Sequence, residues 1–145
     1  MTKKLNIFLL MILFFTHSIP VYSNENFLEE AKKKFNEKKL EDSKFLFQRN
    51  IVFNPKNAES YLYLAKIYNS QKNLIEEEKN LKTTLLLDTD NEEAMYLLIE
   101  IELKKFNYSK VKELQNKFEA ICTQMCQKKK IIEEKLKNIE PKNDS

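Results

Sequence analysis

The chain has 145 residues, with 25 basic and 22 acidic side chains, no glycine and a single histidine, His17. Without glycine it cannot form the glycine-rich loops that bind the phosphates of nucleotides. His17 lies in a segment that we expect to be removed, so no imidazole would remain for a general base or a zinc site. The composition therefore argues against an ordinary enzyme active site, and we expect no cofactor, no metal and no small-molecule substrate.

Residues 1–23 have the three parts of a secretory signal peptide. Lys3 and Lys4 give a positive start, an apolar run covers residues 5–15, and Val21-Tyr22-Ser23 forms a small-residue exit. As a helix the apolar run would rise only about 16 Å, short of the ~30 Å hydrocarbon core of a bilayer. We expect cleavage after Ser23 and a periplasmic or secreted protein. The alternative is an uncleaved membrane anchor that extends to Tyr22, which would be the only contact of the chain with a membrane.

Removal of this segment would leave 23 basic and 22 acidic side chains, a net charge of +1. A nucleic-acid binder normally carries a basic stripe, so we expect no nucleic-acid partner. Three charge runs occur in the remaining chain: Lys32-Lys33-Lys34, Glu76-Glu77-Glu78 and Lys128-Lys129-Lys130. We interpret them as solvated helix faces, with electrostatic docking of a partner as the alternative.

From residue 24 the sequence repeats with a period of 34 residues. Shifting the chain by this period aligns three sets of residues: Phe27, Tyr61 and Met95; Ala31 and Ala65; and Leu40, Leu74 and Tyr108. Residues 54–57 and 88–91 fall on the same phase, and their Pro, Asn and Asp residues favour turns. The period predicts three units, 24–57, 58–91 and 92–125.

Each unit shows two helical patterns in succession. In the first half of the second unit the apolar residues recur at the i, i+3, i+4, i+7 spacing of one helix face, and the other units have similar helical patterns. The first-half positions are Phe27, Leu28, Ala31 and Phe35; Tyr61, Leu64, Ala65 and Tyr68; and Met95, Leu98, Ile99 and Ile101. The second-half positions are Leu40, Phe47 and Ile51; Leu74, Leu81, Leu85 and Leu86; and Tyr108, Val111, Leu114, Phe118 and Ile121. No segment alternates with the period of a strand, so the predicted fold class is all-α.

Residues 126–140 are predicted to form a capping helix. The last unit of a helical array needs a neighbour with a polar outer side. Lys and Glu cover one face of this segment, and the other face is apolar: Ile131, Ile132, Leu136 and Ile139. Pro141 opens a polar tail, 141–145, which we expect to be disordered.

The repeat resembles the tetratricopeptide repeat (TPR), whose first helix carries an aromatic residue, then Leu, a small residue and Tyr. Residues 58–91 match best, with Tyr61, Leu64, Ala65, Tyr68, Leu81 and Thr84 in place. Residues 24–57 supply Ala31, Ser43, Phe47 and Pro55. The chain departs at Glu77, Ile99 and Gln115, where the family has small or aromatic residues. The resemblance implies a right-handed solenoid of helix-turn-helix units and a non-enzymatic protein-interaction module in the cell envelope.

The resemblance also implies that the first helices of successive units line a concave groove that binds a peptide or a protein. The candidate groove residues are Leu28, Lys32, Leu62, Lys66, Tyr96 and Glu100. An apolar ridge flanked by charges would suit a short helix or an extended peptide with alternating apolar and charged groups. The alternative is that these residues only complete the superhelix.

Cys122 and Cys126 are the only cysteines, and an exported protein favours a disulfide between them. On a continuous helix their Cβ atoms would lie about 6 Å apart, too far for a disulfide. We expect the helix to break at residues 123–125 and the disulfide to staple the turn. The alternatives for the two cysteines are free thiols on a continuous helix and a redox-active pair, which would make the chain a thiol–disulfide accessory. For the whole protein, a further alternative is a purely structural spacer that stays tethered to the membrane by an uncleaved segment 1–23. A metal site would lack further soft ligands.

Overall fold

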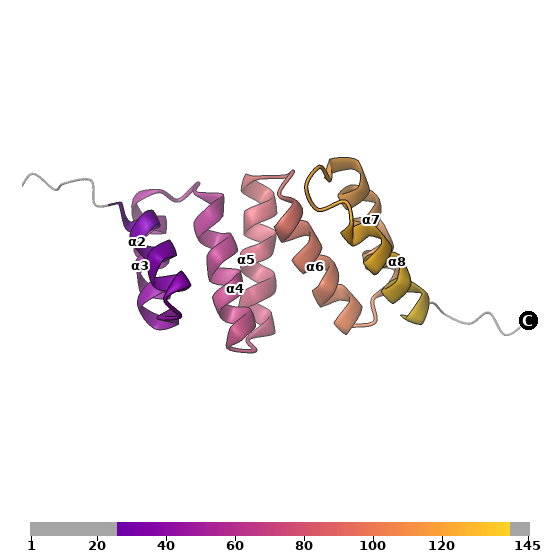
Figure 1. The fold of residues 1–145 in the computed structure, drawn as a ribbon, viewed down its shortest axis with the longest axis horizontal. Coiled ribbons are helices and arrows are strands. Elements are labelled where there is room, and N and C mark those ends of the chain that lie inside the picture. The colour runs from indigo at the N-terminus through magenta and orange to yellow at the C-terminus, as the bar shows by residue number, and fades with distance from the viewer. Residues whose placement is uncertain (1–25, 140–145) are drawn as a thin grey trace, which may run out of the picture.

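The computed structural model describes residues 26–139, so the predicted signal segment, the tail 141–145 and the side chain of Ile139 lie outside the described part. The described chain consists of seven helices and contains no strand, which confirms the all-α fold class. In chain order the helices are α2 (Phe27–Asn36), α3 (Leu40–Phe53), α4 (Ala58–Ser70), α5 (Leu74–Leu87), α6 (Glu92–Lys104), α7 (Tyr108–Ile121) and α8 (Lys128–Ile139). They succeed one another along the long axis of the molecule (Figure 1).

The helices form three antiparallel hairpins, α2–α3, α4–α5 and α6–α7, followed by α8. The second helices of the hairpins begin at Leu40, Leu74 and Tyr108, at the 34-residue spacing of the sequence pattern. The loops that follow α5 and α7 lie at one edge of the array, and the turns inside the second and third hairpins lie at the opposite edge (Figure 1). In the loops between hairpins, Asn57 caps α4 and Asn91 caps α6, because their side-chain oxygens accept hydrogen bonds from the backbone N–H groups of Ser60 and Ala94.

The turn inside each hairpin has the same left-handed backbone conformation. In the second unit the N–H of Asn73 donates to the Tyr68 carbonyl and the N–H of Lys72 donates to the Asn69 carbonyl, which are the two bonds of a Schellman motif. The residues with positive φ are Lys38 (62°), Lys72 (57°) and Phe106 (55°). Glycine is the usual residue at such a position, because a Cβ atom crowds the backbone there. This chain has no glycine, so each hairpin carries the steric cost.

The core lies between hairpins as well as inside them. One buried cluster, formed by Ala31, Phe47, Leu64 and Ile67, joins the first unit to the second. Its aromatic centre is Tyr63, whose ring stacks on Phe47 at 4.9 Å and meets the edge of Phe35 at 5.1 Å. A larger cluster runs from Leu62 in α4 through the third unit to Leu136 in α8. The buried apolar area of each hairpin therefore depends on its neighbour.

The small residues that the sequence placed between helices are buried. Ala31, Ser43 and Ala65 have no exposed surface. The Ser43 hydroxyl donates to the Ala31 carbonyl at 2.9 Å, which satisfies its polar group inside the hairpin. Glu77 occupies the equivalent place in the second unit. It is 3% exposed, and its carboxylate accepts a hydrogen bond of 2.8 Å from the Asn69 amide.

Two predicted packing residues are exposed instead, and for these the sequence prediction was wrong. Leu86 is 81% exposed and Ile131 is 36% exposed. Successive helical residues point about 100° apart, so on a helix with a narrow buried face one member of an adjacent apolar pair can be turned away from the core. Leu85 and Ile132 face the core in their helices. Within the described residues, none of the helices has both the length and the apolar character required to traverse a bilayer.

Replacing Lys72 with glycine should raise the free energy of unfolding by about 0.5–1 kcal/mol, because glycine relieves the left-handed strain at some cost in chain entropy. Urea unfolding followed by circular dichroism measures the change. The control is Lys79→Gly in the exposed interior of α5, which should lower the same quantity by about 1 kcal/mol. Destabilisation by both substitutions would contradict the strain argument.

Replacing Lys39 with asparagine should stabilise the first hairpin by about 1 kcal/mol. Lys39 is the N-cap of α3 and makes no side-chain capping bond, whereas Asn73 and Asn107 cap α5 and α7 through their side-chain oxygens. Thermal unfolding of Lys39→Asn and of the reverse change, Asn73→Lys, should shift the melting temperature in opposite directions. A lower melting temperature for Lys39→Asn would rule out a capping role at this position.

Candidate functional site

The three charged groove candidates form a ladder of ion pairs between successive first helices. Lys32 of α2 pairs with Glu59 of α4 at 3.0 Å, and Lys66 of α4 pairs with Glu93 of α6 at 2.7 Å. At the third step the charges are reversed, and Glu100 of α6 pairs with Lys135 of α8 at 2.6 Å. Lys32 and Lys66 therefore lie where consecutive first helices face each other, and Glu100 lies where α6 faces the capping helix α8. Their predicted contact with a partner is not tested by this arrangement and stays a prediction.

The three apolar candidates lie beside this ladder but are less exposed than a binding ridge would be. Leu62 is 7% exposed and belongs to the larger core cluster. Leu28 is half-buried against the smaller cluster, and Tyr96 is half-buried against the larger one. Burial and a hydrogen bond with Glu100 raise the pKa of Tyr96 to about 12.

Helix α8 covers the part of this face that belongs to the third unit. Its Lys128 ammonium lies 4.9 Å from the centre of the Tyr96 ring, and Lys135 pairs with Glu100. Ile132 and Leu136 of the same helix are buried in the larger core cluster. Of the six candidates, Tyr96 and Glu100 are therefore engaged by the capping helix.

The loop between α7 and α8 brings the two cysteines together. Helix α7 ends at Ile121, Cys122 is extended, and α8 begins at Lys128 rather than at the predicted residue 126. The structure pairs Cys122 with Cys126, with their Cα atoms 5.2 Å apart, inside the range that a disulfide needs. The segment 123–125 is thus closed into a short loop, as the interrupted-helix interpretation requires.

The backbone of this loop holds the carboxylate of Glu92, the first residue of α6. The Thr123 hydroxyl and the Thr123 N–H donate to Oε1 of Glu92, each at 2.6 Å. The N–H groups of Gln124 and Met125 donate to the same carboxylate at 3.1 and 2.6 Å. These hydrogen bonds lower the pKa of Glu92 to about 2, and the bond from the Thr123 hydroxyl has a larger effect than those from the three N–H groups. The carboxylate therefore ties the loop, and with it α8, to the start of the third unit.

A pocket of about 330 Å³ opens beside this anchored loop. It lies between the second and third units, at the edge of the array where the loops after α5 and α7 meet. Residues from three parts of the chain line it: Leu62; Asp88, Asp90, Asn91, Glu92 and Glu93; and Gln124 and Met125. Two features of the first-helix face thus border the pocket: the groove candidate Leu62, and Glu93, which pairs with Lys66 in the ladder.

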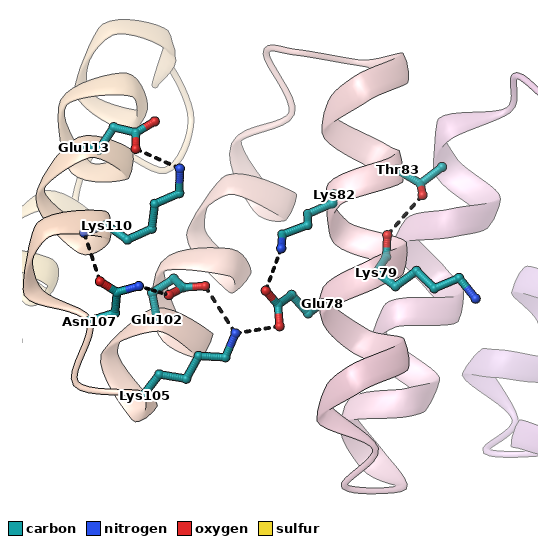
Figure 2. A network of polar contacts seen from close by, with 9 residues as sticks. All are labelled: Glu78, Lys79, Lys82, Thr83, Glu102, Lys105, Asn107, Lys110 and Glu113. Carbon is teal, nitrogen blue, oxygen red and sulfur yellow. Dashed lines mark hydrogen bonds and ion pairs between the residues drawn. The ribbon is translucent and has the colours of Figure 1, made fainter.

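A polar network fixes the second unit to the third at the opposite end of α6. Glu78 of α5 pairs with Lys82 at 2.7 Å and with Lys105 at 2.6 Å (Figure 2). Lys105 also lies 3.4 Å from the buried carboxylate of Glu102, which accepts a hydrogen bond of 2.9 Å from the Asn107 amide. Hydrogen bonds from Lys105 and then Lys82 lower the pKa of Glu78. The two units are therefore held at both ends of α6, with the pocket at one of them.

Sequence reasoning identified Leu62 as a candidate but missed the acidic side of the pocket. The segment Asp88-Thr89-Asp90-Asn91-Glu92-Glu93 contains four carboxylates in six residues, and this was the available signal. The sequence pattern of residues 88–91 predicts only a turn, and acidic residues such as Glu92 and Glu93 are also common at a helix start because they favour the helix dipole.

Glu92→Gln should destabilise the protein at neutral pH, because an amide holds the loop donors less strongly than a carboxylate does. The folded-state pKa of Glu92 is about 2, below its ordinary value of 4.5, so its contribution is present above pH 4.5 and is lost as the pH falls toward 2. Denaturant unfolding at pH 7, 4 and 2.5 should show the difference between the two proteins shrinking. Glu30→Gln at an exposed position of α2 is the control, and a pH-independent difference for Glu92→Gln would contradict the assignment.

No protein-family model matches the sequence, and no curated protein matches it at a significant level. Solved structures do match the fold, with 12–14% sequence identity. The TPR2B domain of yeast Sti1 in complex with pHsp70 superposes with a TM-score of 0.71, at 12% identity, over 80% of this chain and 97% of the domain. The Yersinia enterocolitica type III secretion chaperone SycD, with a peptide of the translocator YopD, gives 0.68 at 14% identity over 83% of this chain and 95% of SycD.

A third neighbour is the first TPR of Spaghetti (RPAP3) bound to the HSP90 peptide SRMEEVD. Its TM-score is 0.64 at 13% identity, over 77% of this chain and 90% of that domain. At these identities the match concerns the fold and not the ligand. The repeated hairpins, the small residues between their helices and these superpositions agree, and they confirm that the chain has a tetratricopeptide-repeat-like fold.

Proposed function

We propose that the chain is an exported adaptor that binds a peptide or protein partner in the cell envelope and does not catalyse a reaction. The observation that carries the proposal is the surface where successive first helices meet, at which ion pairs lead into a pocket between two units. Three structures of the same fold, those of Sti1, SycD and RPAP3, were each solved with a bound partner or peptide. This supports a protein-interaction role for the chain.

Export is supported by the three-part pattern of residues 1–23. In an oxidising compartment the paired Cys122 and Cys126 would form a covalent bond, which would staple the loop that holds Glu92. N-terminal sequencing of the protein from its host should find Asn24 as the first residue. An intact Met1 would instead favour the membrane-tethered spacer.

Site-specific photo-crosslinking in the native host tests partner binding. A photoreactive phenylalanine replaces Glu59, which lies on the first-helix face, or Lys79, which lies on the exposed side of α5. We expect discrete adducts from position 59 and none of these from position 79. Identical adducts from both positions, or none from position 59, would contradict the proposal. Leu62 is unsuitable for this purpose, because it is buried and its replacement would disturb the core.

The rival function, a thiol–disulfide accessory, is tested by changing Cys122 and Cys126 to serine together. An adaptor keeps its position-59 adducts after this change, because Glu59 pairs with Lys32 of α2 and makes no ion pair with the loop that the serines alter. Loss of the biological phenotype with retention of all adducts would instead support a redox role for the pair.

A further inference from the structure

The pocket between the second and third units has a strongly unequal charge. Its lining includes four carboxylates, Asp88, Asp90, Glu92 and Glu93, and no lysine or arginine. The nearest cation in the ladder is Lys66, which pairs with Glu93 at 2.7 Å and so compensates one of the four. Carboxylates gathered around one open, concave feature add their fields there, more than the same charges spread over a flat surface would.

The other three carboxylates accept hydrogen bonds from neutral groups. Glu92 is held by the Thr123 hydroxyl and by backbone N–H groups of the α7–α8 loop. Asp88 accepts from the Asn91 amide at 2.9 Å, and Asp90 accepts from the Thr89 hydroxyl at 3.3 Å. Neutral donors orient these oxygens without cancelling their charge, so the pocket remains negative at neutral pH.

The same pocket has apolar side chains within its lining. Leu62 is almost fully buried and Met125 is half-buried, and both belong to or pack against the larger core cluster. The volume of about 330 Å³ is roughly that of ten liquid water molecules, which leaves room for a long side chain. A ligand that fits this combination has an aliphatic stem for Leu62 and Met125 and a cationic head for the carboxylates. Lysine and arginine have this construction.

We propose that this pocket takes a lysine or arginine side chain of the partner, so that the docking segment of the partner is basic. The inference rests on the proposed function and specifies the chemistry of its ligand. In the ion pairs Lys32–Glu59 and Lys66–Glu93 each charge is balanced by its partner. The uncompensated negative charge that could select a partner on this face therefore comes from the pocket. An acidic segment is disfavoured there because it would meet like charges.

The test uses the protein expressed from the full 145-residue sequence, immobilised and exposed to random displayed dodecapeptides. We expect the selected peptides to be enriched in arginine or lysine beside an apolar residue. For the strongest peptide, replacing its arginine with the neutral isostere citrulline should weaken binding by about tenfold, as loss of a charge-assisted hydrogen bond does. Selection of acidic peptides, selection of none, or equal affinity of the arginine and citrulline peptides overturns the proposal.

The double variant Asp88→Asn with Asp90→Asn tests whether the carboxylates of the pocket cause the preference for arginine. Both asparagines can still accept the local hydrogen bonds, and the double variant should bind the arginine peptide about tenfold more weakly while keeping its helical circular dichroism. Glu30→Gln with Glu134→Gln makes the same change in net charge at exposed positions outside the pocket and should leave affinity within about twofold. Equal weakening by the two double variants would show a general charge effect and would overturn the assignment to the pocket.

The outcome separates this inference from the proposed function. Adducts from position 59 without an arginine preference would keep the adaptor role and reject the basic partner. An arginine preference that depends on Asp88 and Asp90, without adducts in the host, would keep the chemistry of the pocket and reject the adaptor role.

Discussion

A two-helix hairpin of this chain leaves an apolar face that only the next hairpin can cover. The constraint governs both core clusters, because the smaller one joins the first unit to the second and the larger one ends on α8. It also governs the polar contacts, since Lys32 and Lys66 each reach the following first helix and Glu100 reaches the capping helix α8. A surface built from such junctions is fixed in shape only while the neighbouring units remain in place.

The pocket illustrates this dependence. Its lining comes from four places: α4, the loop between α5 and α6, the first turn of α6, and the loop after α7. The Glu78–Lys105–Glu102 network holds one end of α6. The hydrogen bonds from the backbone N–H groups of the α7–α8 loop to the Glu92 carboxylate hold the other end. Elements that are separated by some thirty residues of sequence are therefore presented together as one concave feature.

The sequence predicted much of the fold because the fold is periodic. Ala31 and Ala65 recur at the 34-residue spacing that stacked hairpins explain, and both are buried. The sequence could not decide between adjacent apolar residues such as Leu85 and Leu86, because the rotation of a helix about its axis is set by its neighbours. It also could not place Glu92 against Thr123, 31 residues later, because that contact depends on where α7 ends. Binding surfaces arise at such aperiodic contacts, so the candidate site was harder to predict than the helices.

Helix α8 is the last helix of the described array. Its inner residues Ile132 and Leu136 are buried, whereas Glu133, Glu134, Lys137 and Asn138 are exposed to solvent. A further hairpin, from this chain or another, would have to desolvate those charged groups to stack here. The charged outer side of α8 thus acts against end-to-end polymerisation at this end of the solenoid, a hazard for any protein assembled from self-complementary modules.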